Sequence, residues 1–280
     1  MPGILYLVPT PIGNLGDISR RQAEILSEVD FIAAEDTRVS LTLLNHLDLR
    51  KPLVSYHRHN TETAGPAVLN RLLAGESCAL VTDAGTPAIS DPGEDLVALC
   101  AANGVDVVSI PGPCAAITAL AVSGLPTGRF AFEGFLSINK KLRRAQLEQL
   151  AVEERTLIFY EAPHKLRDTL DDLCEAFGAQ RRIALCRELT KLHEEILRTT
   201  LGEAVEHYAE TDPKGEFVLV VEGAAHAEPE AVTPEAALRR MEQLRDGGLS
   251  MKQAAKQAAE ELKLPKNKLY DLALGKETNW

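Results

Sequence analysis

The segment that decides the fold is residues 78–93, which read CALVTDAGTPAISDPG. Residues 78–81 are apolar or small, and a run of this length between turn signals is typical of a buried strand. The next part, 83–93, contains two prolines, two glycines and two aspartates. This composition predicts a stiff, sharply turned loop. Because ligands of open parallel sheets bind beyond the carboxyl ends of the strands, the loop is a candidate for a binding site.

Short apolar runs alternate with helical patterns through the first part of the chain. One helical pattern opens with a capping box formed by Ser19 and Gln22. This alternation predicts a mostly parallel sheet with helices on both faces, an α/β domain over residues 1–118. The predicted strands are 4–8, 31–34, 53–55, 78–81 and 105–110.

Residues 119–224 show a different pattern, in which several strands follow one another after short connections. Short connections favour antiparallel pairs, so we expect a second α/β domain with a mixed sheet. Its helices are expected at about 140–153 and 164–177. Its predicted strands are 129–136, 155–161, 181–188, 195–201 and 216–223.

Residues 225–280 are predicted to form a linker and a small helical C-terminal extension. Thr233 and Pro234 open one helix, Ser250 caps a second, and a third follows Pro265. The last two helices have the spacing of a helix-turn-helix. A helical appendage that only packs on the rest of the chain is the alternative.

Composition and charge exclude several classes of protein. The formal net charge of the 280-residue chain is −11, which argues against non-specific binding of nucleic acid by the whole surface. No apolar run approaches the length of a membrane span, and the N-terminus lacks the pattern of a signal peptide. The five cysteines form no CxxC pair, which favours reduced thiols, a cytoplasmic protein and no metal site.

The common nucleotide-binding motifs are missing. The loop after the first predicted strand, VPTPIGNLGD, has prolines where a dinucleotide-binding turn needs glycines, and the chain contains neither a P-loop nor a GxSxG motif. Three Pro/Gly loops instead follow predicted strands, at 9–14, 83–93 and 110–116. Prolines supply fixed carbonyls and apolar surface, which suit a cationic, partly apolar ligand such as a sulfonium better than a phosphate.

These loops belong to a longer series of segments that resembles a known family. The series is VPTPIGNLGDIS, AEDTRVS, SYHRHN, VTDAGTPAISDPG, IPGPCA, FYEAPHKL, CRELTKLHEE and KGEFVLVVEG. In this order the segments resemble the S-adenosylmethionine-dependent tetrapyrrole methylase superfamily, and within it the branch that modifies ribosomal RNA. The resemblance implies two α/β domains with S-adenosylmethionine in the cleft between them, usually in a homodimer. It also implies 2′-O-methylation of a decoding-centre cytidine in 16S rRNA of the small ribosomal subunit.

The resemblance also implies which residues bind the cofactor. Thr86 stands where the superfamily has an aspartate and Cys114 where it has a hydroxyl, so a hydrogen bond from Cys114 is in doubt. Cys186 replaces an alanine that is more frequent in the branch. The implied cofactor-binding residues are Pro11, Ile12, Gly85, Thr86, Pro87, Ile89, Cys114, Ala115, Tyr160, Leu189, Glu216 and Phe217.

A ribose hydroxyl is a poor nucleophile, so a carboxylate that accepts its proton would assist methyl transfer. Glu188 is the first candidate for this base and Asp36 the second. Each has a structural alternative: Glu188 in an interdomain salt bridge with Arg187, and Asp36 as a helix N-cap paired with Arg38. Positive side chains are candidates for RNA phosphate contacts, although a solvated helix face explains each cluster equally well. They are Arg38, His57, Lys140, Lys141, Arg143, Arg144, Arg187, Lys191, Lys252 and Lys256.

Two other functions remain open at this point. A tetrapyrrole C-methylase would use the same cofactor cleft, and a non-catalytic module would bind the nucleotide without turnover. The sequence leaves open whether free rRNA or the assembled subunit is the substrate.

Overall fold

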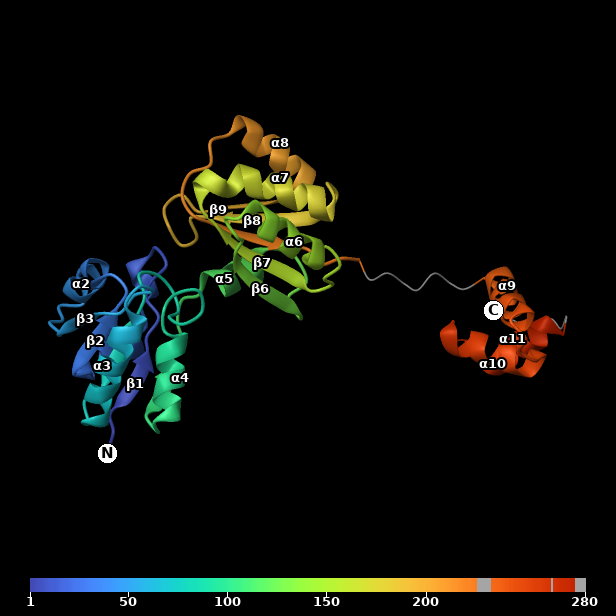
Figure 1. Ribbon diagram of the computed structural model, residues 1–280. Coiled ribbons are helices and arrows are strands. Elements are labelled where there is room, and N and C mark those ends of the chain that lie inside the picture. The colour runs from blue at the N-terminus through green and yellow to red at the C-terminus, as the bar shows by residue number, and fades with distance from the viewer. Residues whose placement is uncertain (226–232, 263, 275–280) are drawn as a thin grey trace. The chain divides into compact units, whose positions relative to one another are not determined.

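The computed structural model describes residues 1–225, 233–262 and 264–274. The chain divides into two compact units, Met1–Ala224 and Ala225–Trp280 (Figure 1). The first unit contains two five-stranded sheets, and the described residues of the second form three helices.

The first sheet is entirely parallel, with the strand order β3-β2-β4-β1-β5. All five strands predicted from the sequence are present. The strands are β1 (Ile4–Leu7), β2 (Phe31–Ala34), β3 (Leu53–Ser55), β4 (Cys78–Val81) and β5 (Asp106–Ser109). Helices α1 (Arg20–Glu28) and α2 (Thr37–His46) pack on one face, and α3 (Thr61–Leu73) and α4 (Glu94–Ala102) pack on the other.

The start of α1 ties this helix to the loop after β1. Ser19 and Gln22 form the predicted capping box, in which Gln22 N donates to Ser19 Oγ at 3.2 Å. The same Gln22 is fully buried, and its Nε2 donates to the carbonyl of Pro9 at 2.8 Å. The cap therefore also fixes the backbone that leads into the first proline loop.

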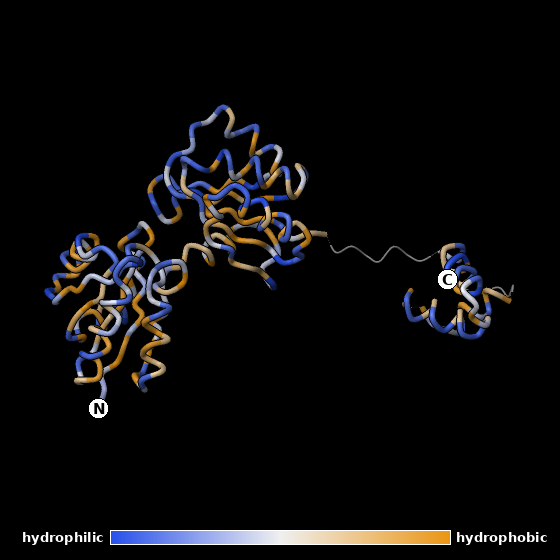
Figure 2. The backbone as a smooth tube through the Cα atoms, in the orientation of Figure 1, coloured by the Kyte–Doolittle hydropathy of each residue, from blue (hydrophilic) through white to orange (hydrophobic). Residues whose placement is uncertain are grey.

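The second sheet is mixed, with the strand order β6-β7-β10-β8-β9. Only β6 and β7 are parallel; the other three neighbouring pairs are antiparallel. Of these three, only β8 and β9 are joined by a short connection, as predicted. The strands are β6 (Phe130–Phe135), β7 (Thr156–Glu161), β8 (Arg182–Arg187), β9 (Glu195–Thr200) and β10 (Phe217–Val221). Figure 2 shows the apolar character of the central strands in both sheets.

Helices cover both faces of the second sheet. The core on one face is shared with α6 (Lys140–Leu150), α7 (Leu166–Phe177) and α8 (Leu201–Glu210). On the other face lies α5 (Ala115–Val122), through Ala116, Ala119 and Leu120. The sequence places a domain boundary between residues 118 and 119, a point that lies inside α5.

Helix α8 was not expected from the sequence. Its signal is a second capping box: Glu203 N donates to Thr200 Oγ1, and Thr200 N donates to Glu203 Oε2 at 3.2 Å. The apolar pattern of residues 195–201 was interpreted as a strand only, and the helix starts directly where β9 ends.

The second unit consists of α9 (Pro234–Asp246), α10 (Met251–Glu261) and α11 (Lys266–Ala273), which confirms the three expected helices. Thr233 Oγ1 accepts from Ala236 N at 3.2 Å, and Gly247 lies at the C-cap of α9. The core is small and includes Met241, Ala255 and Leu269. Over residues 1–225, 233–262 and 264–274, each helix is too short or too polar to cross a membrane.

Candidate active site

Three loops at the carboxyl edge of the first sheet are bonded to one another. Thr10 and Gly85 form an isolated antiparallel bridge, with N–H···O distances of 2.9 and 3.0 Å. Thr10 Oγ1 also donates to the carbonyl of Thr82 at 3.0 Å. Thr86 Oγ1 donates to the carbonyl of Pro113 at 2.8 Å, which joins the loop after β4 to the loop after β5. The proline loops therefore form one continuous surface, which we call the first wall.

Gly85 is required at the centre of this wall. Its φ is +88°, a conformation that side chains disfavour. A Cβ at this position would lie 3.4 Å from Ile12 Cγ2 and 3.8 Å from the carbonyl oxygen of Pro113. The absence of a side chain leaves room between these two loops.

The second sheet provides the opposite surface, which we call the second wall. Tyr160 on β7 lies at its centre, with ring centroids 5.0 Å from Phe132 and 5.7 Å from Phe135. The Tyr160 hydroxyl accepts a hydrogen bond from Ala116 N at 3.1 Å, close to the N-terminus of α5. This bond joins the loop after β5 to the second sheet.

The two walls enclose a cavity of about 600 Å³, a size typical of small-molecule sites. Ten of the twelve residues expected to bind the cofactor line it: Ile12, Gly85, Thr86, Ile89, Cys114, Ala115, Tyr160, Leu189, Glu216 and Phe217. Pro11 and Pro87 do not belong to the lining. Pro87 is buried behind the surface, where it shapes the loop.

Three carboxylates of the first wall also line the cavity and were not selected from the sequence. Glu35 follows β2, and Asp83 and Asp91 lie in the loop after β4. The hydroxyl of Thr82 donates to Glu35 Oε2 at 2.7 Å. The signal was present in AEDTR and VTDAGTPAISDPG, because carboxylates directly after parallel strands reach the same sheet edge.

The surroundings of Asp83 and Asp91 disfavour negative charge on both side chains. Burial raises the pKa of Asp91, and the neighbouring charges of Glu35 and Asp83 raise it further, against the opposing effects of Thr82 and Arg58. Burial also raises the pKa of Asp83, although its carboxylate accepts the backbone N–H of Asp36 at 3.0 Å.

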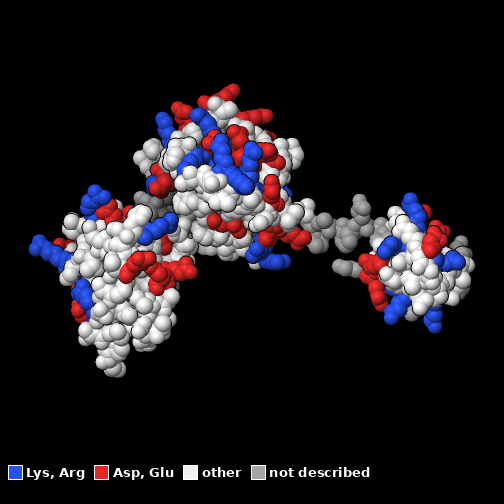
Figure 3. Space-filling model, viewed as in Figure 1, with Lys and Arg blue, Asp and Glu red and all other residues white. Residues whose placement is uncertain are grey.

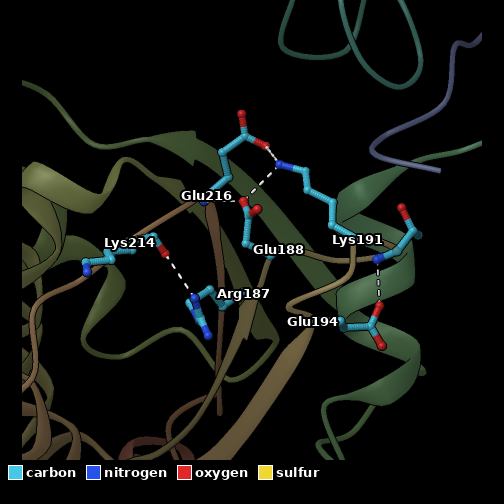
Figure 4. A network of polar contacts seen from close by, with 7 residues as sticks. Arg187, Glu188, Lys191, Glu194, Lys214 and Glu216 are labelled. Atoms are coloured by element: carbon cyan, nitrogen blue, oxygen red, sulfur yellow. Dashed lines mark hydrogen bonds and ion pairs between the residues drawn. The ribbon is translucent and has the colours of Figure 1, made fainter.

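The second wall holds its charged groups in a network around Lys191 (Figure 4). Lys191 Nζ lies 2.8 Å from Glu188 Oε1 and 3.0 Å from Glu216 Oε2. Glu188 Oε1 also accepts the backbone N–H of Glu216 at 2.9 Å. The hydrogen bond from Lys191 is the main cause that lowers the pKa of Glu188. Glu188 is thus held as a paired anion and is not among the cavity-lining residues, which argues against its role as a base.

Asp36 adopts its structural alternative. It is the N-cap of α2, where it accepts the N–H of Arg38 at 2.8 Å, and Arg38 Nε donates to the same oxygen at 3.0 Å. The hydrogen bond from the Arg38 side chain lowers the pKa of Asp36 to about 2. Asp36 does not line the cavity either, so both predicted bases lie outside the cavity lining.

The basic cluster on α6 divides into exposed and buried residues. Lys140, Lys141 and Arg144 are exposed and face one open hollow. Arg143 is a correction: it is only 7% exposed and forms an ion pair with Asp172, so it supports the packing of α6 on α7 and is unavailable to RNA. Cations and anions alternate over the helices that cover the second sheet (Figure 3).

The other side chains predicted to contact RNA differ in their exposure and in whether they already form an ion pair. Arg38 is exposed but paired with Asp36, and Arg187 lies 3.0 Å from Glu195. His57 is half-buried, and its Nδ1 accepts the N–H of His59 at 3.3 Å. Lys252 and Lys256 are exposed on α10. Further along the chain, Lys263 lies outside the described residues, as do the side chains of Lys266 and Lys268.

Further lining residues come from the second wall. Phe135 is 59% exposed at the end of β6, and His164 follows β7. Glu161 is 5% exposed, and its two oxygens accept from Ala162 N at 2.8 Å and Thr169 Oγ1 at 2.6 Å. Within the described ranges no group of three or more His, Cys, Asp or Glu side chains is arranged to hold a metal ion.

Known proteins share this architecture. Residues 4–205 match the family model of Tetrapyrrole (Corrin/Porphyrin) Methylases. Among solved structures, the methyltransferase CobJ aligns with a TM-score of 0.60 and 19% identity over 80% of this chain and 95% of its own. A Thermus thermophilus uroporphyrin-III C-methyltransferase complexed with S-adenosylhomocysteine aligns with a TM-score of 0.55 and 20% identity, covering 78% and 97% of the two chains.

Relatives with higher identity extend over nearly the whole chain. The ribosomal RNA small subunit methyltransferase I of Synechocystis sp. is 49% identical over 277 residues, or 99% of both proteins. That of Halalkalibacterium halodurans is 50% identical over 273 residues, or 96% of this chain and 94% of its own. Residues 230–277 match the model named RsmI C-terminal HTH domain, in agreement with the helix-turn-helix spacing. The chain therefore belongs to the tetrapyrrole methylase family and, within it, to the family of ribosomal RNA small subunit methyltransferase I.

Proposed function

We propose that this protein uses S-adenosylmethionine to methylate the 2′-hydroxyl of a cytidine in the rRNA of the small ribosomal subunit. The observation that carries the proposal is the cavity between the walls, found in a chain about half identical to proteins named for this rRNA activity. The two-domain fold alone would equally suit a tetrapyrrole methylase, because a uroporphyrin-III C-methyltransferase shares this fold at 18–20% identity.

The residues of the cavity fit this cofactor. Gly85 carries no side chain beside Ile12, and both residues line the cavity. Ile12, Leu189 and Val218 offer apolar contacts, and the carboxylates of the first wall favour a positively charged centre. The fixed carbonyls of the proline loops act in the same direction.

When bound, S-adenosylmethionine supplies a methyl group on a positively charged sulfur. The two walls would hold the cofactor, and the acceptor hydroxyl would have to lie in line with that methyl group. In well-oriented systems such positioning lowers the barrier by about 7–11 kcal/mol. Tyr160 fixes one side of the cavity through Ala116, and the Thr86–Pro113 bond fixes the other.

The decisive test offers radiolabelled S-adenosylmethionine to three acceptors: undermethylated small subunits, naked 16S rRNA and a precorrin. We expect label in the rRNA, in a nucleotide whose 3′ linkage resists alkaline cleavage because the 2′-oxygen is blocked. Label in the precorrin alone would establish the tetrapyrrole alternative. Binding of the cofactor without transfer to any acceptor would establish the non-catalytic alternative. The ratio of label in the small subunits to label in naked 16S rRNA shows whether the assembled subunit or the free rRNA is the preferred substrate.

We also propose that exposed cations hold the RNA backbone while the acidic remainder limits non-specific binding. Lys140, Lys141 and Arg144 would contribute from α6, and Lys252 and Lys256 from α10. The triple change of the α6 residues to Ala should weaken rRNA binding and flatten its salt dependence, because fewer counterions are released. An Arg239→Ala change on α9 serves as a control for loss of an exposed arginine outside these clusters. An unchanged salt slope in the triple variant would remove α6 from the RNA interface.

The protein is further proposed to act in the cytoplasm as a homodimer. A two-fold axis would present each basic cluster twice to the same RNA. Light scattering after size-exclusion chromatography gives the mass in solution, and a value near 30.4 kDa would identify a monomer.

A further inference from the structure

The carboxylates that line the cavity differ in what already binds them. Glu161 has both oxygens bonded within the second wall. Asp83 accepts a backbone N–H, and Glu216 pairs with Lys191. Glu35 accepts the hydroxyl of Thr82 at 2.7 Å. Each of these four has a bond that fixes it in the fold.

Asp91 is held differently. Its side-chain hydrogen-bonding neighbour is the hydroxyl of Thr82, whose single proton is donated to Glu35. Among the described residues Asp91 forms no ion pair within 4.0 Å. The Thr82 hydroxyl favours the anionic form of Asp91. The Asp91 carboxylate also keeps acceptor sites for another donor, such as a hydroxyl in the cavity.

Asp91 is also placed to act across the cavity. It lines the cavity from the first wall, and Tyr160 lines it from the second. Burial, with smaller effects of Cys114 and Asp91, raises the pKa of Tyr160 to about 12. Asp91 thus lies within electrostatic reach of the opposite wall.

We propose that Asp91 is the catalytic base that accepts the proton of the acceptor hydroxyl. The hydroxyl oxygen forms a bond to the methyl carbon as the carbon–sulfur bond breaks, and that electron pair remains on sulfur. The hydroxyl proton passes to the Asp91 carboxylate, from which solvent removes it. This inference rests on the proposed function, because it assigns a residue to that reaction.

The groups that face Asp91 set the pH at which it can act. Glu35 after β2 and Asp83 after β4 favour its protonated form, and the neutral Tyr160 on β7 adds no charge. Arg58, whose guanidinium donates to the carbonyl of Ser90 at 3.1 Å, favours the anion. Activity should therefore rise with pH as Asp91 loses its proton, at a pH above the usual range of an aspartate.

The kinetic test measures single-turnover methylation of undermethylated small subunits between pH 5 and 9. Asp91→Asn should lower the rate about 10²-fold or more and remove the rise on the acid side of the profile. Asp91→Glu should retain that rise. Glu94→Gln, which removes an exposed carboxylate from the start of the adjacent α4, should stay within about twofold of the parent. A rate within about threefold of the parent, or a persistent acid-side rise in Asp91→Asn, overturns the proposal.

A second measurement does not depend on turnover. Asp91→Asn should bind S-adenosylmethionine within about tenfold of the parent by calorimetry, because Glu35 and Asp83 still line the first wall. Because the folded state raises the pKa of Asp91, its anion destabilises the fold above that pKa. Asp91→Asn should therefore unfold at a higher urea concentration at pH 8, and the difference should shrink as the pH falls. A variant less stable at every pH would assign Asp91 to loop structure and overturn the proposal. If the parent protein methylates no rRNA, the proposed function fails. The pH-dependent difference in urea unfolding between Asp91→Asn and the parent would still show whether Asp91 is protonated.

Discussion

The two walls of the cavity use carboxylates in opposite ways. On the first wall, Glu35, Asp83 and Asp91 affect one another, and the pKa values of the two aspartates are raised. On the second wall, Glu188 and Glu216 share Lys191, and the pKa of Glu188 is lowered. Crowded carboxylates are suited to exchange protons, whereas paired ones are suited to hold a loop in place.

The direction of the strands explains this difference. In the parallel first sheet, the residues after β2 and β4 emerge at one edge, so their carboxylates meet. In the second sheet β8 and β10 are antiparallel, with Phe217 opposite Arg187. The residues that follow β8 therefore lie beside those that precede β10. Lys191 from one segment consequently meets Glu216 from the other.

The largest effect is expected from Thr86→Arg on the first wall. A long cation at this position would occupy the cavity and oppose a positively charged sulfur, so affinity for S-adenosylmethionine should fall at least 100-fold, about 2.7 kcal/mol. Isothermal calorimetry on the folded variant measures this change. Thr42→Arg on the exposed face of α2 is the matched control and should bind normally. Unchanged affinity in Thr86→Arg would remove this loop from the cofactor site.

The next prediction concerns stability on the second wall. Glu188→Gln should reduce the free energy of unfolding by about 1–3 kcal/mol at pH 7, because Lys191 loses one charged partner. Methylation should fall less than about fivefold. Urea unfolding and single-turnover rates measure both quantities, with the exposed Glu206→Gln on α8 as a control. A 100-fold loss of rate at unchanged stability would make Glu188 the base and reverse the comparison of the walls.

The same variant has a defined pH dependence. The folded pKa of Glu188 is lower than its unfolded value, so its stabilising effect is present above the unfolded value, about 4.3. The effect is lost as the pH falls through the folded pKa. The unfolding curves of Glu188→Gln and the parent should therefore converge below about pH 4, whereas convergence only above pH 7 would contradict the assignment.

A smaller effect is expected where the two walls are joined. Tyr160→Phe removes the acceptor for Ala116 N, at a cost of about 1–3 kcal/mol if no water replaces it. Cofactor affinity should weaken about threefold to tenfold, because the loop before α5 is held less firmly. Tyr208→Phe, on the α8 side of the same sheet, is the control and should leave affinity unchanged. Equal affinities of the two variants for S-adenosylmethionine would show that the Tyr160–Ala116 hydrogen bond does not help to form the cofactor site.

The smallest effect is expected from Cys114→Ser. Cys114 is the N-cap of α5 with extended backbone angles, and its side chain forms no capping hydrogen bond. A serine can accept an N–H of the first turn, so thermal unfolding should report a gain of about 0.5–1 kcal/mol. Cofactor affinity should change less than about threefold. A larger change would mean that the thiol contacts the cofactor directly.

Local patterns were sufficient for much of the fold and part of the site. Apolar runs predicted all five strands of the first sheet, and the Pro/Gly loops predicted the edge at which the cavity lies. Helix α8 was missed because the strand before it has no separating loop. Arg143 was grouped with Lys140 and Arg144, since sequence proximity does not say which side of a helix is buried.

Which carboxylate can act as the base depends on contacts between residues that are far apart in the sequence. Glu188 and Asp36 are candidates because they lie at the ends of predicted strands, and both are held by nearby cations. Asp91 shares the same loop as Asp83 in the sequence, and nothing in their spacing separates them. Only packing shows that Asp91 adjoins Thr82 and Glu35.

The sequence by itself determined the strands, the turns at their ends and the family resemblance, because these depend on periodicity and on residues close together in the chain. Tertiary structure decided which charges are paired, which are buried and which face the cavity. The reason is physical: a pKa depends on burial and on charges brought together by the fold. Lys191 meets Glu216 across 25 residues, and Thr82 meets Glu35 across 47.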